Sequence, residues 1–71
     1  MECEIVLEII PSGVNGWDYL KAKTVRFKNV LRAIRFAEYY TKMHKCLIKY
    51  SAQGKWRATY CDGYQIWNCY N

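Results

Sequence analysis

The segment spanning residues 27–45, FKNVLRAIRFAEYYTKMHK, constrains the fold most strongly because its apolar residues recur with the period of an α-helix. At 100° per residue, one side of this helix collects the residues that we expect to be buried. They are Val30, Ala33, Ile34, Ala37, Tyr40, Thr41 and His44. The opposite side carries four cations and one tyrosine, here called the helix stripe, namely Lys28, Arg32, Arg35, Tyr39 and Lys42. At a rise of 1.5 Å per residue the stripe is roughly 21 Å long. Either Thr24 or Asn29 can cap the helix.

Before the helix, the pattern predicts two strands joined by a loop. Residues 2–10 alternate, with Cys3, Ile5, Leu7 and Ile9 on one side and three glutamates on the other. Residues 11–16 read as a loop because Pro11 cannot donate to a ladder and two glycines and an asparagine follow it. Residues 17–23 then read as the second strand.

After the helix, two turns set the registers of three further strands. Asp62-Gly63 is a two-residue hairpin signal that pairs Cys61 with Tyr64 and Ala58 with Trp67. A three-residue loop over 52–54 pairs Tyr50 with Trp56 and Ile48 with Ala58. The expected core face then contains Cys46, Ile48, Tyr50, Trp56, Ala58, Tyr60, Trp67 and Cys69. The expected outer face contains Leu47, Lys49, Lys55, Arg57, Thr59, Tyr64, Ile66, Asn68 and Tyr70.

These elements predict a single α+β domain over residues 1–71, with the order ββαβββ. The first strand carries apolar residues on both sides, which suits a central place in the sheet. Because consecutive strands usually neighbour one another, we expect the spatial strand order 2-1-3-4-5, antiparallel throughout. A single helix covers one face of this five-stranded sheet.

The charge of the chain is unevenly distributed along its length. The formal net charge is +5, but residues 1–20 carry four acids and no Lys or Arg, whereas residues 21–57 hold all eleven cations against Glu38 alone. A basic face attracts phosphates, acidic proteins or anionic lipid, although lysines and arginines also serve solubility. With no apolar run approaching a membrane span and no secretory signal, we expect no membrane partner and a cytosolic location with reduced thiols.

The residues favour binding over catalysis. His44 is the only histidine and is expected on the buried side of the helix, so no nucleophile has an evident base. The four cysteines form no C-x-x-C pair, and we expect buried free thiols and neither metal nor cofactor. The helix stripe is the expected partner-binding site, and DNA or RNA is one candidate ligand. A secondary binding face comprises Lys49, Arg57, Tyr64 and Tyr70. Self-association through the face containing Tyr64, Ile66 and Tyr70 is an alternative, and the oligomeric state stays open.

The helix segment AIRFAEYY and the tail GKWRATYCDGYQIWNCY carry a resemblance to a known class of proteins. In size and layout the whole chain resembles the small anti-CRISPR proteins of phages and mobile elements, in particular a type I-F inhibitor with one helix on a curved antiparallel sheet. It departs from them in its four cysteines and its richness in Tyr and Trp. The resemblance implies a stoichiometric inhibitor that acts in the host cytoplasm. Such an inhibitor would bind a host CRISPR effector protein or ribonucleoprotein and block its access to nucleic acid, using Lys28, Arg32, Arg35 and Lys42.

Overall fold

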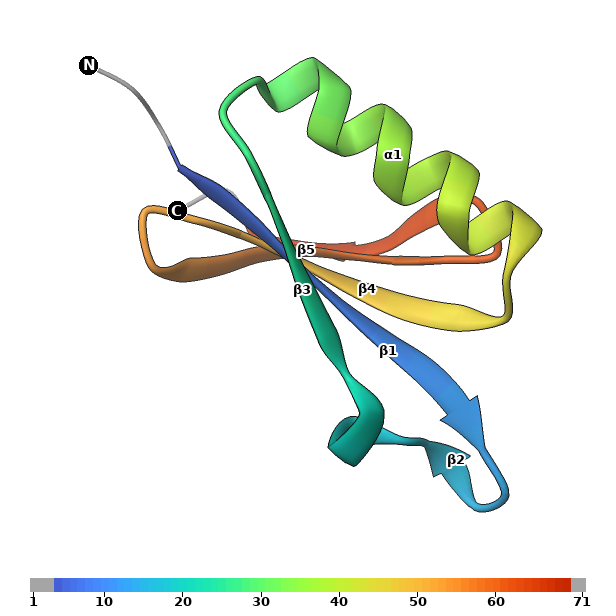
Figure 1. Ribbon diagram of the computed structural model, residues 1–71. Coiled ribbons are helices and arrows are strands. Elements are labelled where there is room, and N and C mark those ends of the chain that lie inside the picture. The colour runs from blue at the N-terminus through green and yellow to red at the C-terminus, as the bar shows by residue number, and fades with distance from the viewer. Residues whose placement is uncertain (1–3, 70–71) are drawn as a thin grey trace.

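One helix lies across one face of a curled antiparallel sheet in the computed structural model, which describes residues 4–69 (Figure 1). Along the chain these elements are β1 (Ile5–Gly13), β2 (Gly16–Trp17), the 3₁₀ helix η1 (Tyr19–Lys21), β3 (Lys23–Phe27), α1 (Val30–Met43), β4 (Cys46–Ala52), β5 (Lys55–Cys61) and β6 (Tyr64–Asn68). The strand order is β2-β1-β4-β5-β6, with β3 also paired to β1. The expected α+β class, the antiparallel pairing and the central place of the first strand are therefore confirmed.

The segment before the helix differs from the expected strand, loop and strand. Residues 11–13 continue β1, and the chain turns back over Val14-Asn15 into the short strand β2. Pairing passes through Pro11 because its carbonyl accepts a hydrogen bond from the Asp18 N–H at 2.7 Å, while the missing proline N–H is not needed. The Asp18 side chain then accepts from the Leu20 N–H at 3.2 Å and caps η1. The expected second strand is thus interrupted at Asp18, and its main pairing with β1 is made by β3.

The helix begins later than its periodicity suggested. The Asn29 side chain accepts a hydrogen bond from the Arg32 N–H at 3.0 Å, so Asn29 is the cap and Lys28 precedes the helix. Two residues expected on the buried side, Val30 and His44, are exposed. His44 follows the last helical residue, and its ring packs against the Tyr40 ring with centroids 4.4 Å apart.

The core lies between α1 and the middle strands. Three small helix residues, Ala33, Ala37 and Thr41, are buried against the sheet. The sheet contributes the core residues Ile5, Leu7, Ile9, Cys46, Ile48, Tyr50, Ala58 and Tyr60. All of these sheet residues were expected on that face, because they recur at every second position of their strands.

Two residues expected in the core, Trp56 and Trp67, do not lie there. The β4–β5 register shifts between Tyr50 and Ser51, so that Tyr50 pairs with Ala58 and Ser51 with Trp56, leaving Arg57 as an extra residue.

The β5–β6 register shifts in the same way. Cys61 pairs with Tyr64 as expected, but Thr59 pairs with Trp67 and Ala58 with Asn68, so that Ile66 is the extra residue. A one-residue bulge reverses the side on which the following residues point. Trp67 therefore leaves the core face, and Asn68 takes the helix side that had been expected for Trp67.

A buried hydroxyl connects the helix to the β5–β6 turn. Thr41 Oγ1 donates to the Ala37 carbonyl at 2.7 Å and accepts from the Gly63 N–H at 3.0 Å. Gly63 has a φ of +86°, and a Cβ at this position would lie 3.2 Å from the Lys42 Cβ. Glycine is therefore required here both by the backbone conformation and by the close approach of the helix.

We predict that Thr41→Val lowers the free energy of unfolding by about 1–3 kcal/mol, because it keeps the shape of the side chain and leaves the Gly63 N–H without its acceptor. Chemical denaturation measures this change. Thr24→Val, at an exposed position of β3, is the matched control and should change stability by no more than about 0.5 kcal/mol. Equal effects of the two substitutions would show that the Thr41 hydroxyl does not stabilise the packing of helix on turn.

The described cysteines Cys46, Cys61 and Cys69 are free thiols, and Cys3 lies outside the described residues. Cys46 is buried as expected, whereas Cys61 and Cys69 are only half-buried. Burial, and secondarily the neighbouring Cys61, raises the pKa of the Cys46 thiol above its ordinary value of 9.0. Since the folded state favours the neutral thiol, this group's contribution to stability is present below pH 9 and is lost as pH rises above it.

We predict that iodoacetamide labels Cys46 more slowly in the folded protein than in urea, since only an accessible thiolate reacts. In the folded protein the labelling rate should still be rising above pH 9, whereas in urea it should level off near that value. Mass spectrometry of the Cys46 peptide gives both rates. Equal rates in the two conditions would contradict the burial of this thiol.

Candidate binding surfaces

The helix stripe faces solvent. Arg32, Arg35 and Tyr39 are exposed on α1, Lys42 is exposed where its stem passes the β5–β6 turn beside Gly63, and Lys28 is exposed just before the helix. Among residues 4–69, no carboxylate forms an ion pair with Arg32, Arg35 or Lys42. The helix part of the expected site is therefore brought together on the exposed surface of α1.

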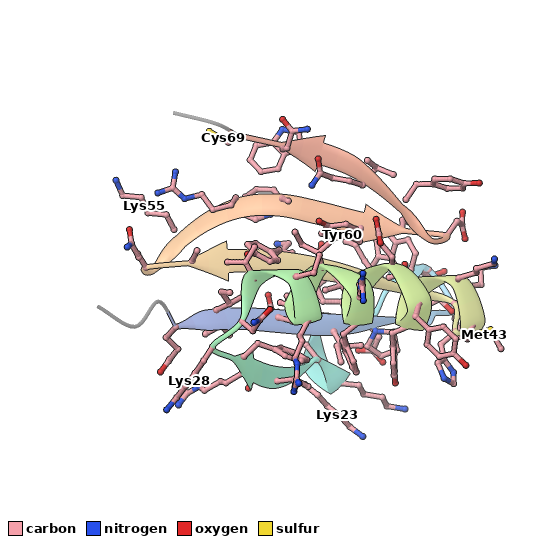
Figure 2. The ribbon with its side chains drawn as sticks, turned by 90° about the horizontal axis from the view of Figure 1, so that it is seen from above. Lys23, Lys28, Met43, Lys55, Tyr60 and Cys69 are labelled. Carbon is pink, nitrogen blue, oxygen red and sulfur yellow. The ribbon has the colours of Figure 1, made fainter. Side chains whose placement is uncertain are left out.

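A second row of cations lies along the edge strand β3. Lys21, Lys23, Arg26 and Lys28 are exposed there, and Figure 2 shows Lys23 and Lys28 projecting from this edge beside the helix. The Arg26 Nε lies 3.7 Å from Glu4 Oε1, an exposed pair that offsets one of these charges. The sequence reasoning did not connect the row with the stripe, although the four cations within eight positions were a usable signal. Lysines on an edge strand also discourage pairing with another sheet.

The secondary binding face is not gathered as expected. Lys49 lies on the sheet face away from the helix, here called the outer face, and Tyr64 is exposed opposite Cys61 at the β5–β6 turn. Arg57, the extra residue of β5, instead lines a cavity on the helix side together with Val30 and Ile34. Tyr70 lies outside the described residues.

The outer face instead holds a groove built from aromatic side chains. Its volume is about 420 Å³, and its lining residues are Trp17, Tyr19, Leu47, Lys49, Trp56, Thr59, Ile66 and Trp67. One wall comes from β2 and η1, which Figure 1 shows on the side of the sheet away from α1. The opposite wall comes from β5 and β6, and β4 supplies Leu47 and Lys49 to the floor. We call this hollow the outer groove.

The rings of the outer groove are held in place. The Trp56 Nε1–H donates to Thr59 Oγ1 at 2.9 Å and to the Ala58 carbonyl at 3.1 Å. The Trp56 and Trp67 ring centroids are 4.4 Å apart. The Lys49 Nζ lies 4.9 Å from the Trp56 ring and 5.2 Å from the Tyr19 ring, so its ammonium connects the two walls through cation–π contacts.

The sequence reasoning missed this groove for a specific reason. Trp56 was assigned to the core from a three-residue loop over 52–54, Trp67 from a register with no extra residue in β6, and Trp17 and Tyr19 were read as part of a regular strand. The available signal was the number of large aromatic residues, which exceeds what one helix on one sheet face can cover.

The described residues offer no clustered metal ligands. Within residues 4–69, no three His, Cys, Asp or Glu side chains are placed to hold a metal ion together. In the same part of the chain, no helix has the length and apolar character needed to cross a membrane.

Comparison with known proteins finds no matching family model, no similar curated protein and no similar solved structure. The anti-CRISPR resemblance therefore has no support from these comparisons.

Proposed function

We propose that this protein is a non-enzymatic binding module that contacts the phosphate backbone of a nucleic acid through the helix stripe. The observation that carries the proposal is the solvent-facing row of Arg32, Arg35 and Lys42 on one side of α1, without a paired carboxylate in residues 4–69. The β3 row continues this basic surface at the edge of the sheet beside the helix (Figure 2). Phosphate contacts of this kind position a protein on nucleic acid without reading its sequence.

The position of Arg32 in the helix is better explained by an external partner than by a local stabilising role. Lys42 stands in the last helical turn, where a cation interacts favourably with the helix dipole. Arg32 lies in the first turn, where the dipole opposes a positive charge, and Asn29 already caps that end. A local stabilising role therefore explains Lys42 but not Arg32, and an external anion supplies the missing partner.

A finer proposal follows from the resemblance alone. The phosphate backbone would then belong to nucleic acid held by a host CRISPR effector, or the stripe would dock on an acidic surface of that effector, and the protein would act as a stoichiometric inhibitor in the host cytoplasm. The two versions differ in whether isolated nucleic acid is bound.

We predict that a labelled duplex binds at low salt and that the logarithm of the binding constant falls linearly with the logarithm of the salt concentration, with a slope near −0.9 for each phosphate neutralised. Arg35→Glu should weaken binding and reduce the slope by about one or more. Lys55→Glu changes the net charge equally but lies at the β4–β5 turn, away from the stripe, so it serves as the control (Figure 2). Equal effects of the two variants in gel shifts would dismiss the stripe as the contact.

For the finer proposal, we expect the protein to reduce target-DNA binding by a purified type I-F effector at near-equimolar ratio, and Arg32→Glu/Arg35→Glu to abolish this reduction. Pull-down with and without nuclease shows whether the contact is with protein or nucleic acid. If DNA binding by the effector is unchanged and nothing co-purifies, the inhibitor proposal fails, while the direct phosphate contact is judged separately by the gel shifts.

A further inference from the structure

We infer that the outer groove is a second binding site, which takes unpaired bases of a single-stranded nucleic acid by stacking. This site lies on the opposite face of the molecule from the helix stripe and does not depend on the proposed function. Three tryptophans line the groove and are nevertheless exposed. Trp17, Trp56 and Trp67 keep 36%, 48% and 41% of their surface accessible. Large aromatic side chains gathered in one exposed hollow mark a binding surface.

The rings of the groove are prepared for stacking before any ligand arrives. Trp56 is fixed by two hydrogen bonds from its Nε1–H, and Trp67 packs against it. Because these rings are already ordered, a ligand that stacks on them loses little side-chain entropy of the protein. A base contributes roughly 1–3 kcal/mol when it stacks on an aromatic side chain, and every base has a suitable face.

The groove also has the charge that a strand needs. Lys49 stands in its floor, and Lys45 lines a neighbouring hollow that shares Trp17 with the groove. Cations interleaved with aromatic rings are typical of sites that follow a single-stranded backbone. The two walls stand close together, because the Lys49 Nζ lies within 5.2 Å of the Tyr19 ring on one wall and 4.9 Å of the Trp56 ring on the other.

Other occupants fit the groove less well. A second copy placed face to face by a two-fold axis would bring two Lys49 ammonium groups into one apolar contact, where desolvation of like charges is costly. A peptide that adds a strand needs a free sheet edge, whereas the groove lies across a sheet face. A duplex keeps its base faces stacked inside and presents no free base to the rings.

The test uses an oligothymidylate of about eight nucleotides, a length within the site sizes known for such modules. All three tryptophans of the chain line the groove, so intrinsic fluorescence reports on this surface and not on the helix stripe. We expect quenching of tryptophan fluorescence that saturates together with the anisotropy of a labelled oligonucleotide. The single strand should also quench this fluorescence at lower concentration than a duplex of the same length.

Two variants give the structural test. Tyr19→Ala and Trp67→Ala should each weaken binding roughly 5- to 150-fold, the range expected for losing one stacked ring. Tyr19→Phe, which keeps the ring, should restore it. Leu31→Ala removes an exposed apolar side chain of α1 that belongs to neither the stripe nor the groove, and it should leave the oligonucleotide affinity unchanged. Because Tyr19 is half exposed and outside the core, its variants keep the test valid even where Trp67→Ala is unstable.

Several outcomes would overturn the inference. They are binding without tryptophan quenching, equal affinity of Tyr19→Ala and the parent protein, stronger quenching by the duplex than by the single strand, or a dimer in light scattering that Tyr19→Ala abolishes without any oligonucleotide. Arg35→Glu should leave the quenching intact. Failure of the stripe and failure of the groove are therefore distinguishable.

Discussion

The close packing of α1 on the sheet through Ala33, Ala37 and Thr41 determines most of what the rest of the molecule exposes. Small side chains at the contact bring the helix close enough for the Thr41 hydroxyl to accept from the Gly63 N–H. Larger side chains, such as Phe36, then lie beside the contact and are partly buried. With that face inward, the geometry of an α-helix leaves Arg35 and Tyr39 on the far side. The exposed stripe is therefore a consequence of how the core is built.

One helix covers one sheet face, and the other face must be protected by different means. A chain of 71 residues has few residues left to form a second layer of secondary structure over the outer face. The outer face is covered instead by β2 and η1, folded back over it, and by aromatic side chains that pack on one another. Such a cover is incomplete, because ring faces stay accessible where no second helix lies over them. The outer groove results from this incomplete cover.

Much of the fold could be predicted from the sequence, because it depends on strong periodic signals. The helix residues Ala33 and Ala37 and the strand residues Ile5, Leu7 and Ile9 fall on the expected sides. The predicted β4–β5 register was wrong because two local rules conflict there. The turn residues favour one pairing of the strands, and the alternation of core residues favours another. A two-residue turn at Gln53-Gly54 has positive φ at both residues and would by itself pair Ala58 with Lys49.

The extra residue Arg57 resolves this conflict by returning Ala58 to the core side opposite Tyr50. Ile66 is likewise an extra residue after Asp62-Gly63, where both turn residues again have positive φ, but this bulge takes Trp67 off the core side. Each bulge places a tryptophan on the outer face, so the features that alternation alone could not predict are those that build the groove. The helix stripe, by contrast, was predictable because exposed positions of a regular helix follow from its period alone.

The two candidate surfaces lie on opposite sides of an elongated molecule with extents of 41 × 21 × 21 Å, so a ligand on one does not obstruct the other sterically. Coupling between the two would have to pass through the sheet, whose core residues Ile48 and Tyr60 are fully packed under the helix. Because the stripe and the groove share no residue, we expect the two surfaces to bind independently.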